Sequence, residues 1–192
     1  MTSVASELRK RTWTKGAYFI STDASLVPVP QLNDMFDSEQ FYWGKALPDD
    51  AMREMLDNSL VFGLYERDVE AGDTVTSSAA RDSPDKSALT FLGLARCVTD
   101  FTTLIYLTDV WVGSETRGKG LGKWLIKCVQ EVVNEQPHLR RSMLFTGDWE
   151  RSVPFYRELM GMEVVKFRQG EGLAMMEKRG PGHPRFVKEE SG

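Results

Sequence analysis

The chain has 192 residues, of which 41% are hydrophobic and 27% are charged. This composition excludes a wholly disordered protein and is enough for one domain with its own core. The formal net charge is −4, so the basic surface of a nucleic-acid-binding protein is not indicated. No apolar run is long enough to span a membrane, and charged residues interrupt the N-terminal segment where a signal peptide would need an apolar core. We therefore expect neither a nucleic-acid nor a membrane partner.

The two cysteines, Cys97 and Cys128, both lie in apolar stretches. Cysteines in such stretches are usually buried as free thiols, and disulfides are rare inside cells. We therefore predict a cytoplasmic protein. The two histidines, His138 and His183, do not combine with the scattered cysteines into a ligand set for a metal ion, so we predict no metal site.

Short strands and helices are expected to alternate in the first half of the chain. Residues 1–15 are polar without periodicity, which predicts a flexible N-terminus. A strand is predicted over 17–21, and a helix over about 31–36 with Pro30 in its first turn. Pro48 and the acidic residues after it open a second helix, because negative charge favours a helix N-terminus. A strand over 60–65 follows.

The segment 66–87 is polar and rich in Gly, Ser, Ala and Asp. We interpret it as a mobile loop within one domain, because neither side of it could form a complete fold. That domain is expected to span residues 16–178. The glycines and prolines of residues 179–192 predict a flexible tail.

The second half of the chain begins with two apolar strands, predicted over 89–99 and 103–112 and joined by a tight antiparallel turn. An amphipathic helix is predicted from Leu121 until Pro137 stops it, with an apolar stripe at three-four spacing. A strand over 141–146 and a short helix from Ser152 to Gly161 follow. Strands over 162–167 and 173–176 complete the pattern.

A glycine-rich turn, Gly113 to Gly122, connects the strand over 103–112 to the amphipathic helix. The first turn of a helix has unpaired N–H groups and a positive dipole end, so this order of elements predicts an anion site. A nucleotide-binding Walker A loop would need a hydroxyl at Gly120, and a dinucleotide fingerprint would need a different glycine spacing. The alternative is a connecting turn that binds nothing.

A third phosphate pattern, R-x-x-G-x-G, fits Arg117, Gly120 and Gly122. The segment D-V-W-V-G-S-E-T-R-G-K-G-L-G-K-W-L closely resembles the strand and pyrophosphate loop of the GNAT acyl-CoA N-acyltransferases. F-Y-R-E-L-M-G-M resembles that family's F-Y-x-x-L-G-F box with Met160 added, and three shorter segments (F-Y-W-G-K, N-S-L-V-F-G-L-Y and A-R-C-V-T-D) are similar to a small-molecule-type subgroup. The order of predicted elements over residues 17–177 is also that of the family.

This resemblance implies an α/β (α+β) GNAT fold. Its mixed central sheet of about seven strands would be flanked by about four helices, with a cleft where two central strands splay. The resemblance also assigns the binding of acetyl-CoA. Backbone groups of the strand would pair with the pantetheine arm, and the turn would hold the pyrophosphate; the residues so implied are Val110, Trp111, Val112, Arg117, Gly118, Lys119, Gly120, Leu121, Gly122 and Lys123.

The resemblance further implies that Tyr156 protonates the leaving thiolate as a general acid. Its position alone would equally fit an aromatic residue that fills the core. The proton acceptor is less defined: Asp109 is a carboxylate in an otherwise apolar strand beside the expected acetyl site. A structural role for Asp109 is equally compatible with the sequence, and Asp100 and Glu115 are weaker alternatives.

We therefore predict an N-acetyltransferase that moves an acetyl group from acetyl-CoA to a primary amine by direct attack in a ternary complex. A small-molecule acceptor is favoured, with Tyr42, Trp43 and Tyr106 as its contacts, although the aromatic residues near 41–43 could also be core. A CoA-binding sensor without turnover, or transfer of another acyl group, is the alternative. The sequence leaves a homodimer open.

Overall fold

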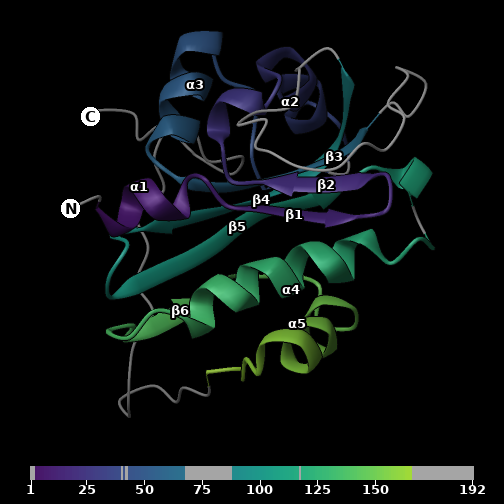
Figure 1. Cartoon of the computed structure of the whole chain (residues 1–192). Helices are drawn as coiled ribbons and strands as arrows, with labels where there is room; N and C mark the ends of the chain where they lie inside the picture. Colours follow the sequence, from purple (N-terminus) through teal and green to yellow (C-terminus); the bar gives the residue numbers. More distant parts are fainter. Residues whose placement is uncertain (1–2, 40, 42, 68–87, 117, 166–192) are drawn as a thin grey trace, which may run out of the picture.

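The computed structural model describes residues 3–39, 41, 43–67, 88–116 and 118–165. Six strands of this part form one sheet in the order β1-β2-β3-β4-β5-β6 (Figure 1), with antiparallel neighbours except for the parallel pair β5 and β6. The strands are β1 (Thr12–Lys15), β2 (Tyr18–Ser21), β3 (Leu60–Arg67), β4 (Leu89–Thr99), β5 (Leu104–Val112) and β6 (Arg141–Met143). The helices are α1 (Val4–Leu8), η1 (Ala24–Leu26), α2 (Val29–Phe36), α3 (Asp49–Asp57), η3 (Ser114–Thr116), α4 (Leu121–Asn134) and α5 (Ser152–Met160).

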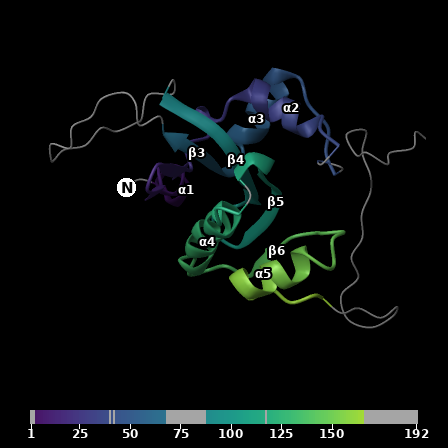
Figure 2. The same ribbon diagram turned by 90° about the vertical axis from the view of Figure 1, so that its right-hand side faces the viewer.

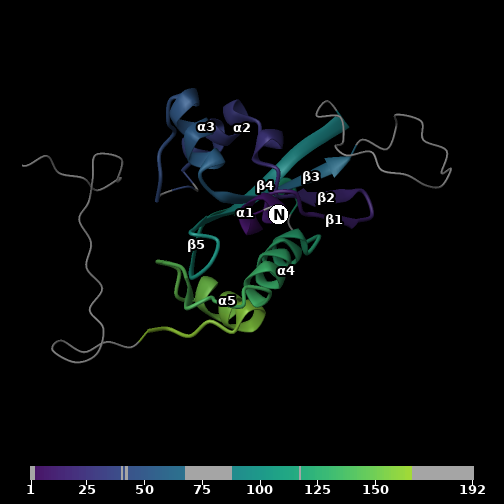
Figure 3. The same cartoon turned by 60° about the vertical axis from the view of Figure 1, so that its left-hand side comes forward.

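The helices cover the two faces of the sheet. Figures 1 and 2 both show α2 and α3 on one side of the sheet and α4 and α5 on the other. Figure 3 shows the same separation from a third direction. The mixed α/β fold class predicted from the sequence is therefore confirmed.

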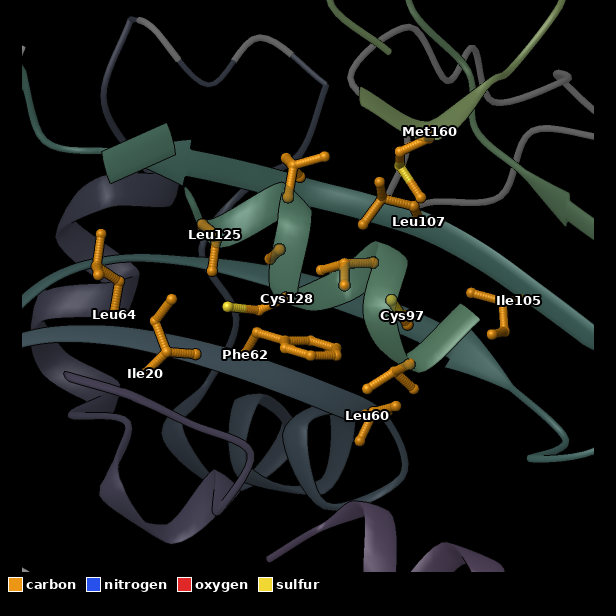
Figure 4. Packing of buried hydrophobic residues seen from close by; sticks show 14 of the residues in the cluster. Ile20, Leu60, Phe62, Leu64, Cys97, Ile105, Leu107, Leu125, Cys128 and Met160 are labelled. Atoms are coloured by element: carbon orange, nitrogen blue, oxygen red, sulfur yellow. The ribbon is translucent and has the colours of Figure 1, made fainter. Parts of the chain in front are cut away.

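The larger core cluster lies between the sheet and α4. Leu125 and Cys128 of α4 point toward Phe62, Cys97 and other apolar residues of the central strands (Figure 4). Burial of this apolar stripe explains why the sequence places apolar residues three and four apart along α4. A second cluster packs α2 and α3 against the opposite face through Leu32, Met52 and Val61. Both cysteines are free and buried, as predicted.

The N-terminal segment differs from its prediction. Residues 1–15 were expected to be flexible, but they contain α1 and β1. Leu8 is buried in the larger core, and the ring of Trp13 stacks on Phe62 at 5.7 Å. Arg11 also forms an ion pair with Glu135, the residue that caps the C-terminal end of α4. These contacts join residues far apart in the sequence, so local polarity gave no sign of them.

Other differences from the prediction concern the end of β3 and the number of strands and helices. Glu66 and Arg67, placed in the mobile loop, are the last residues of β3 and pair with Thr90 and Leu89. The described part contains six strands and five α-helices instead of seven and four. β1 and α1 are additional, residues 162–165 are not a strand, and the strand predicted over 173–176 lies outside the described residues. The rest of the predicted loop (68–87), the remainder of the C-terminal hairpin and the tail lie outside the described residues.

The helix predictions are confirmed with small shifts. Pro30 lies in the first turn of α2, and Met52 and Leu56 of α3 are buried. Gly161 ends α5 with φ +63°, a conformation that glycine adopts without steric cost. Within the described residues, no helix is long and apolar enough to cross a membrane.

Candidate active site

A bulge interrupts the pairing of β5 with β4. Leu94 pairs with Trp111 and Arg96 pairs with Thr108, so the single residue Ala95 lies opposite two residues, Asp109 and Val110. Asp109 has φ +49°, in the left-handed region that non-glycine residues rarely adopt. A bulge bends its strand and redirects side chains, and bulges are frequent next to active sites. The bulge therefore marks this part of β5 as a candidate site.

The opposite edge of β5 opens directly beside this bulge. β6 pairs with β5 only from Leu104 to Tyr106, where the partner is Met143. Beyond Tyr106, β5 continues to Val112 without a strand partner on that edge among the described residues. Unpaired N–H and C=O groups of a strand edge can pair with an extended ligand. This unpaired edge contains Val110, Trp111 and Val112, for which contact with a pantetheine arm stays a prediction.

The glycine-rich turn follows at the end of β5. Gly113 donates its N–H to Leu92 O at 2.8 Å, and Thr116 closes the turn with its N–H and hydroxyl on Gly113 O at 3.1 and 2.6 Å. Gly118 and Gly120 have φ values of +80° and +70°. The local conformation therefore depends on glycine at both positions.

Backbone donors at the start of α4 point to an anion site. The helical hydrogen bonds begin with Trp124 N–H on Gly120 O at 3.1 Å. The preceding N–H groups of Leu121, Gly122 and Lys123 therefore have no acceptor within the helix. A Cβ atom built on Gly118 or Gly120 would meet no atom within 4 Å, so there is open space beside the turn. These donors and this space fit a pyrophosphate.

The turn was also predicted to bind through Lys119 and Arg117. Lys119 N–H donates to Thr116 O at 3.3 Å, so it is already used within the turn. Its side chain extends over the ring of Tyr18, and a hydrogen bond to Tyr18 raises the pKa of Lys119. Arg117 lies outside the described residues. Thr116, which the sequence analysis did not single out, is a buried anchor of the turn.

Tyr156 lies on α5, next to α4. Lys123 and Glu158 join the two helices by an ion pair at 3.2 Å. The Tyr156 ring is half-buried and packs against the same core cluster as Val110 and Val112. Burial raises the pKa of Tyr156 to about 12. Tyr156, the predicted acid, therefore packs on the same side of the sheet as the side chains of Val110 and Val112.

Asp109 is buried, with 6% of its side chain exposed, and several donors hold its carboxylate. Arg96 Nε lies 2.6 Å from Oδ2, while Trp43 Nε1 and Thr108 Oγ donate to Oδ1 at 3.3 and 3.2 Å. Both oxygens therefore already have donors. Of the two roles considered for Asp109, this geometry favours the structural one.

The aromatic residues predicted to contact the acceptor lie at different places. The Trp43 ring is 4.2 Å from Phe41, and 39% of Trp43 is exposed, whereas Phe41 is core at 1%. Tyr106 is half-buried, and its ring is 5.4 Å from that of Phe145. Tyr42 lies outside the described residues.

The other carboxylates proposed as bases have structural contacts. Asp100 accepts hydrogen bonds from Thr103, Thr102 and Leu104, and these bonds lower its pKa. Glu115 folds over Gly113, where a Cβ atom would collide with it. Among the described residues, no group of three or more His, Cys, Asp and Glu side chains could hold a metal ion.

A cavity of about 260 Å³ lies elsewhere, between α1, the β4–β5 turn and the end of α4. Its lining includes Leu8, Phe101 and His138. None of the predicted site residues lines it. The candidate active site is therefore the open edge of β5 and the adjoining turn.

Arg96 is the main site residue that the sequence analysis missed. It lies in the apolar strand β4 as Asp109 lies in the apolar strand β5. Opposite charges in two adjacent apolar strands are a signal of a buried ion pair, because an unpaired buried charge is costly. That signal was available in the segments A-R-C-V-T and L-T-D-V-W.

Comparisons with known proteins agree with this geometry. The model of the acetyltransferase (GNAT) family matches residues 32–162. A candidate acetyltransferase of Gibberella zeae is 34% identical over 171 residues, which cover 85% of this chain and 94% of that protein. A crystal structure described as a GNAT-family acetyltransferase of Xanthomonas campestris aligns with a TM-score of 0.62 and 25% identity, over 90% of this chain and all of the other. A Deinococcus radiodurans structure has a TM-score of 0.53 and 19% identity, covering 88% and 94% of the two chains, and shows the fold alone. The chain therefore belongs to the GNAT family of acetyltransferases and is an acyltransferase enzyme.

Proposed function

We propose that this enzyme transfers an acetyl group from acetyl-CoA to the primary amine of a small molecule, by direct attack in a ternary complex. The observation that carries this proposal is the continuity of two binding features. The unpaired edge of β5 runs directly into a turn that has open space beside Gly118 and Gly120 and ends in N–H groups without a helical acceptor. An extended arm that ends in a pyrophosphate matches this sequence of donors.

In the proposed complex, Val110 to Val112 pair with the pantetheine arm. Gly118, Gly120, Leu121, Gly122 and Lys123 supply backbone N–H groups to the pyrophosphate. The helix dipole of α4 adds favourable electrostatics at this end. An N–H near Val110, beside the bulge, stabilises the oxyanion of the tetrahedral intermediate in this proposal.

The chemical step joins the amine nitrogen to the thioester carbonyl carbon and breaks the carbon–sulfur bond. The thiolate that leaves takes the phenolic proton of Tyr156, and the amine nitrogen loses one proton to water. The Tyr156 phenolate then regains a proton from solvent, so the products are the amide and the CoA thiol. The raised pKa of Tyr156 keeps the phenol protonated at neutral pH, as a general acid requires. Because the carboxylate of Asp109 is fully engaged, we assign the amine proton to solvent.

A route through an acetylated cysteine has less support. Burial raises the pKa of both Cys97 and Cys128 to about 12. A thiol with such a pKa forms almost no thiolate at neutral pH, and the thiolate is the nucleophile. The free buried thiols also support a cytoplasmic location, which we propose on this ground.

The test measures thiol release from acetyl-CoA across a panel of small primary amines. We expect at least one amine to stimulate release, with stoichiometric N-acetylation seen by mass spectrometry. In parallel, CoA alone should raise the melting temperature. If no amine stimulates thiol release while CoA still raises the melting temperature, the non-catalytic CoA-binding alternative stands. Turnover with a longer acyl donor but not with acetyl-CoA would leave transfer of another acyl group.

A further inference from the structure

Arg96 connects the end of α3 to the bulge of β5. Only 14% of its side chain is exposed, and its Nε lies 2.6 Å from Asp109 Oδ2. Its Nη1 donates to Ser59 Oγ at 3.1 Å, and the Ser59 hydroxyl donates to the carbonyl of Met55 in α3 at 2.7 Å. The guanidinium is therefore fixed from two sides, by a helix end and by the neighbouring strand.

Asp109, the partner of Arg96, has an unfavourable backbone conformation. A non-glycine residue with φ +49° persists where its surroundings determine it, although aspartate tolerates this region better than most residues. A charge-assisted hydrogen bond between an arginine and a carboxylate is among the strongest bonds available to hold it. The ion pair thus stabilises the bulge beside which the edge of β5 opens.

The same carboxylate also holds Trp43. The indole N–H of Trp43 donates to Asp109 Oδ1 at 3.3 Å. Trp43 is the exposed end of an aromatic row in which the ring centroids of Phe36 and Phe41 are 4.1 Å apart, and those of Phe41 and Trp43 are 4.2 Å apart. One buried ion pair therefore contacts both the bulge of β5 and a partly exposed aromatic side chain.

We propose that Arg96 is a positioning residue of the transferase site. Acting through Asp109, it fixes the bulge of β5 at the reacting end of the donor and holds Trp43 against the acceptor side. This proposal rests on the proposed function. Arg96 itself touches neither substrate, and the pyrophosphate turn is formed by other residues. Loss of Arg96 should therefore lower turnover and acceptor binding much more than it weakens CoA binding.

The experiment compares Arg96→Met, Arg96→Lys and the double variant Arg96→Met/Asp109→Asn with the wild type. We expect Arg96→Met to lower kcat by about tenfold to a hundredfold, because a displacement of about 1 Å at the reacting centre has this effect. The Kd for CoA should rise much less than kcat falls, since the pyrophosphate turn, which holds the other end of the donor, is an independent site. Arg96→Lys, which keeps the charge without the fork of donors, should recover part of kcat.

The double variant separates positioning from stability. Replacing both partners leaves no unpaired buried charge, so the melting temperature should recover most of its loss while kcat stays low. If kcat recovers together with the melting temperature, the ion pair serves stability alone and the proposal is wrong. Arg53→Met is the matched control: Arg53 bonds the carbonyls of Ala24 and Val27, and its loss should lower the melting temperature without changing kcat.

A second measurement does not depend on turnover. The emission of Trp43 is obtained by subtracting the emission of the Trp43→Phe variant from that of the same chain with Trp43. This difference is recorded in the wild-type and in the Arg96→Met background. We expect acrylamide to quench Trp43 more strongly in the Arg96→Met chain. Unchanged quenching would overturn the coupling through Asp109. If no amine is acetylated even by the wild type, the proposed function fails, while this measurement still tests the link from Arg96 to Trp43.

Discussion

Substitution of Gly120 by alanine tests the turn at the start of α4. Gly120 has φ +70°, and a Cβ atom at this position would meet nothing within 4 Å. The substitution therefore costs backbone strain without a steric clash. The left-handed conformation costs a non-glycine residue about 1–2 kcal/mol. For a chain of this length, each kcal/mol lowers the melting temperature by about 2–4 °C, so we expect a decrease of about 2–8 °C.

The structure offers a matched control in Gly161. This residue ends α5 with φ +63° and is equally open, with nothing within 4 Å of a built Cβ. Gly161→Ala should therefore have a similar cost in stability. Only Gly120 belongs to the proposed pyrophosphate turn, so the two variants should differ in their affinity for CoA and not in their melting temperatures.

Isothermal titration with CoA measures this difference. A hydrogen bond to a charged group contributes about 1.5–3 kcal/mol, and each 1.4 kcal/mol corresponds to about tenfold in Kd. If Gly120→Ala displaces one such donor, it should weaken CoA binding by about tenfold to a hundredfold, while Gly161→Ala leaves the Kd within about twofold. Equal Kd values for the two variants would refute the assignment of this turn to the pyrophosphate.

Three other predictions concern single side chains. Tyr156→Phe should lower kcat by about a hundredfold with the Kd for CoA unchanged, since a general acid contributes at least about this factor. Because the pKa of Tyr156 is raised to about 12, the kcat of the wild type should show no loss from ionisation of Tyr156 up to about pH 10. Steady-state kinetics would check both expectations. Burial raises the pKa values of Cys97 and Cys128 to about 12. Both thiols should therefore resist iodoacetamide at pH values near 8 in the folded protein and react in denaturant. Labelling of the native protein would contradict this. Asp100→Asn should lower the melting temperature at neutral pH, because hydrogen bonds from Thr103, Thr102 and Leu104 lower the pKa of Asp100 and favour its ionised form in the folded state. That contribution is present above the unfolded-state pKa of about 3.9 and is lost as the pH falls further, so thermal melts of the two proteins should converge in acid.

The sequence by itself determined the features that depend on local spacing. The stripe of apolar residues along α4 and the glycines of the turn each lie within a few residues of one another, and helices and turns form from such short-range interactions. The resemblance of this segment to one family was therefore enough to predict a donor site at the turn. The start of α2 near Pro30 and the end of α5 at Gly161 followed from the same local chemistry.

Only the tertiary structure decided which distant residues meet. The strand at Thr12–Lys15 depends on Trp13 packing on Phe62, and no pattern within residues 1–15 encodes that contact. The sequence singled out Asp109 as a suspicious carboxylate, but its role depends on Arg96 across a strand and on Trp43, which is 66 residues away. Strand register and buried ion pairs arise from long-range pairing, in which a shift of one residue changes every contact. For this reason the donor turn could be predicted from the chain alone, whereas the bulge and the arginine that holds it could not.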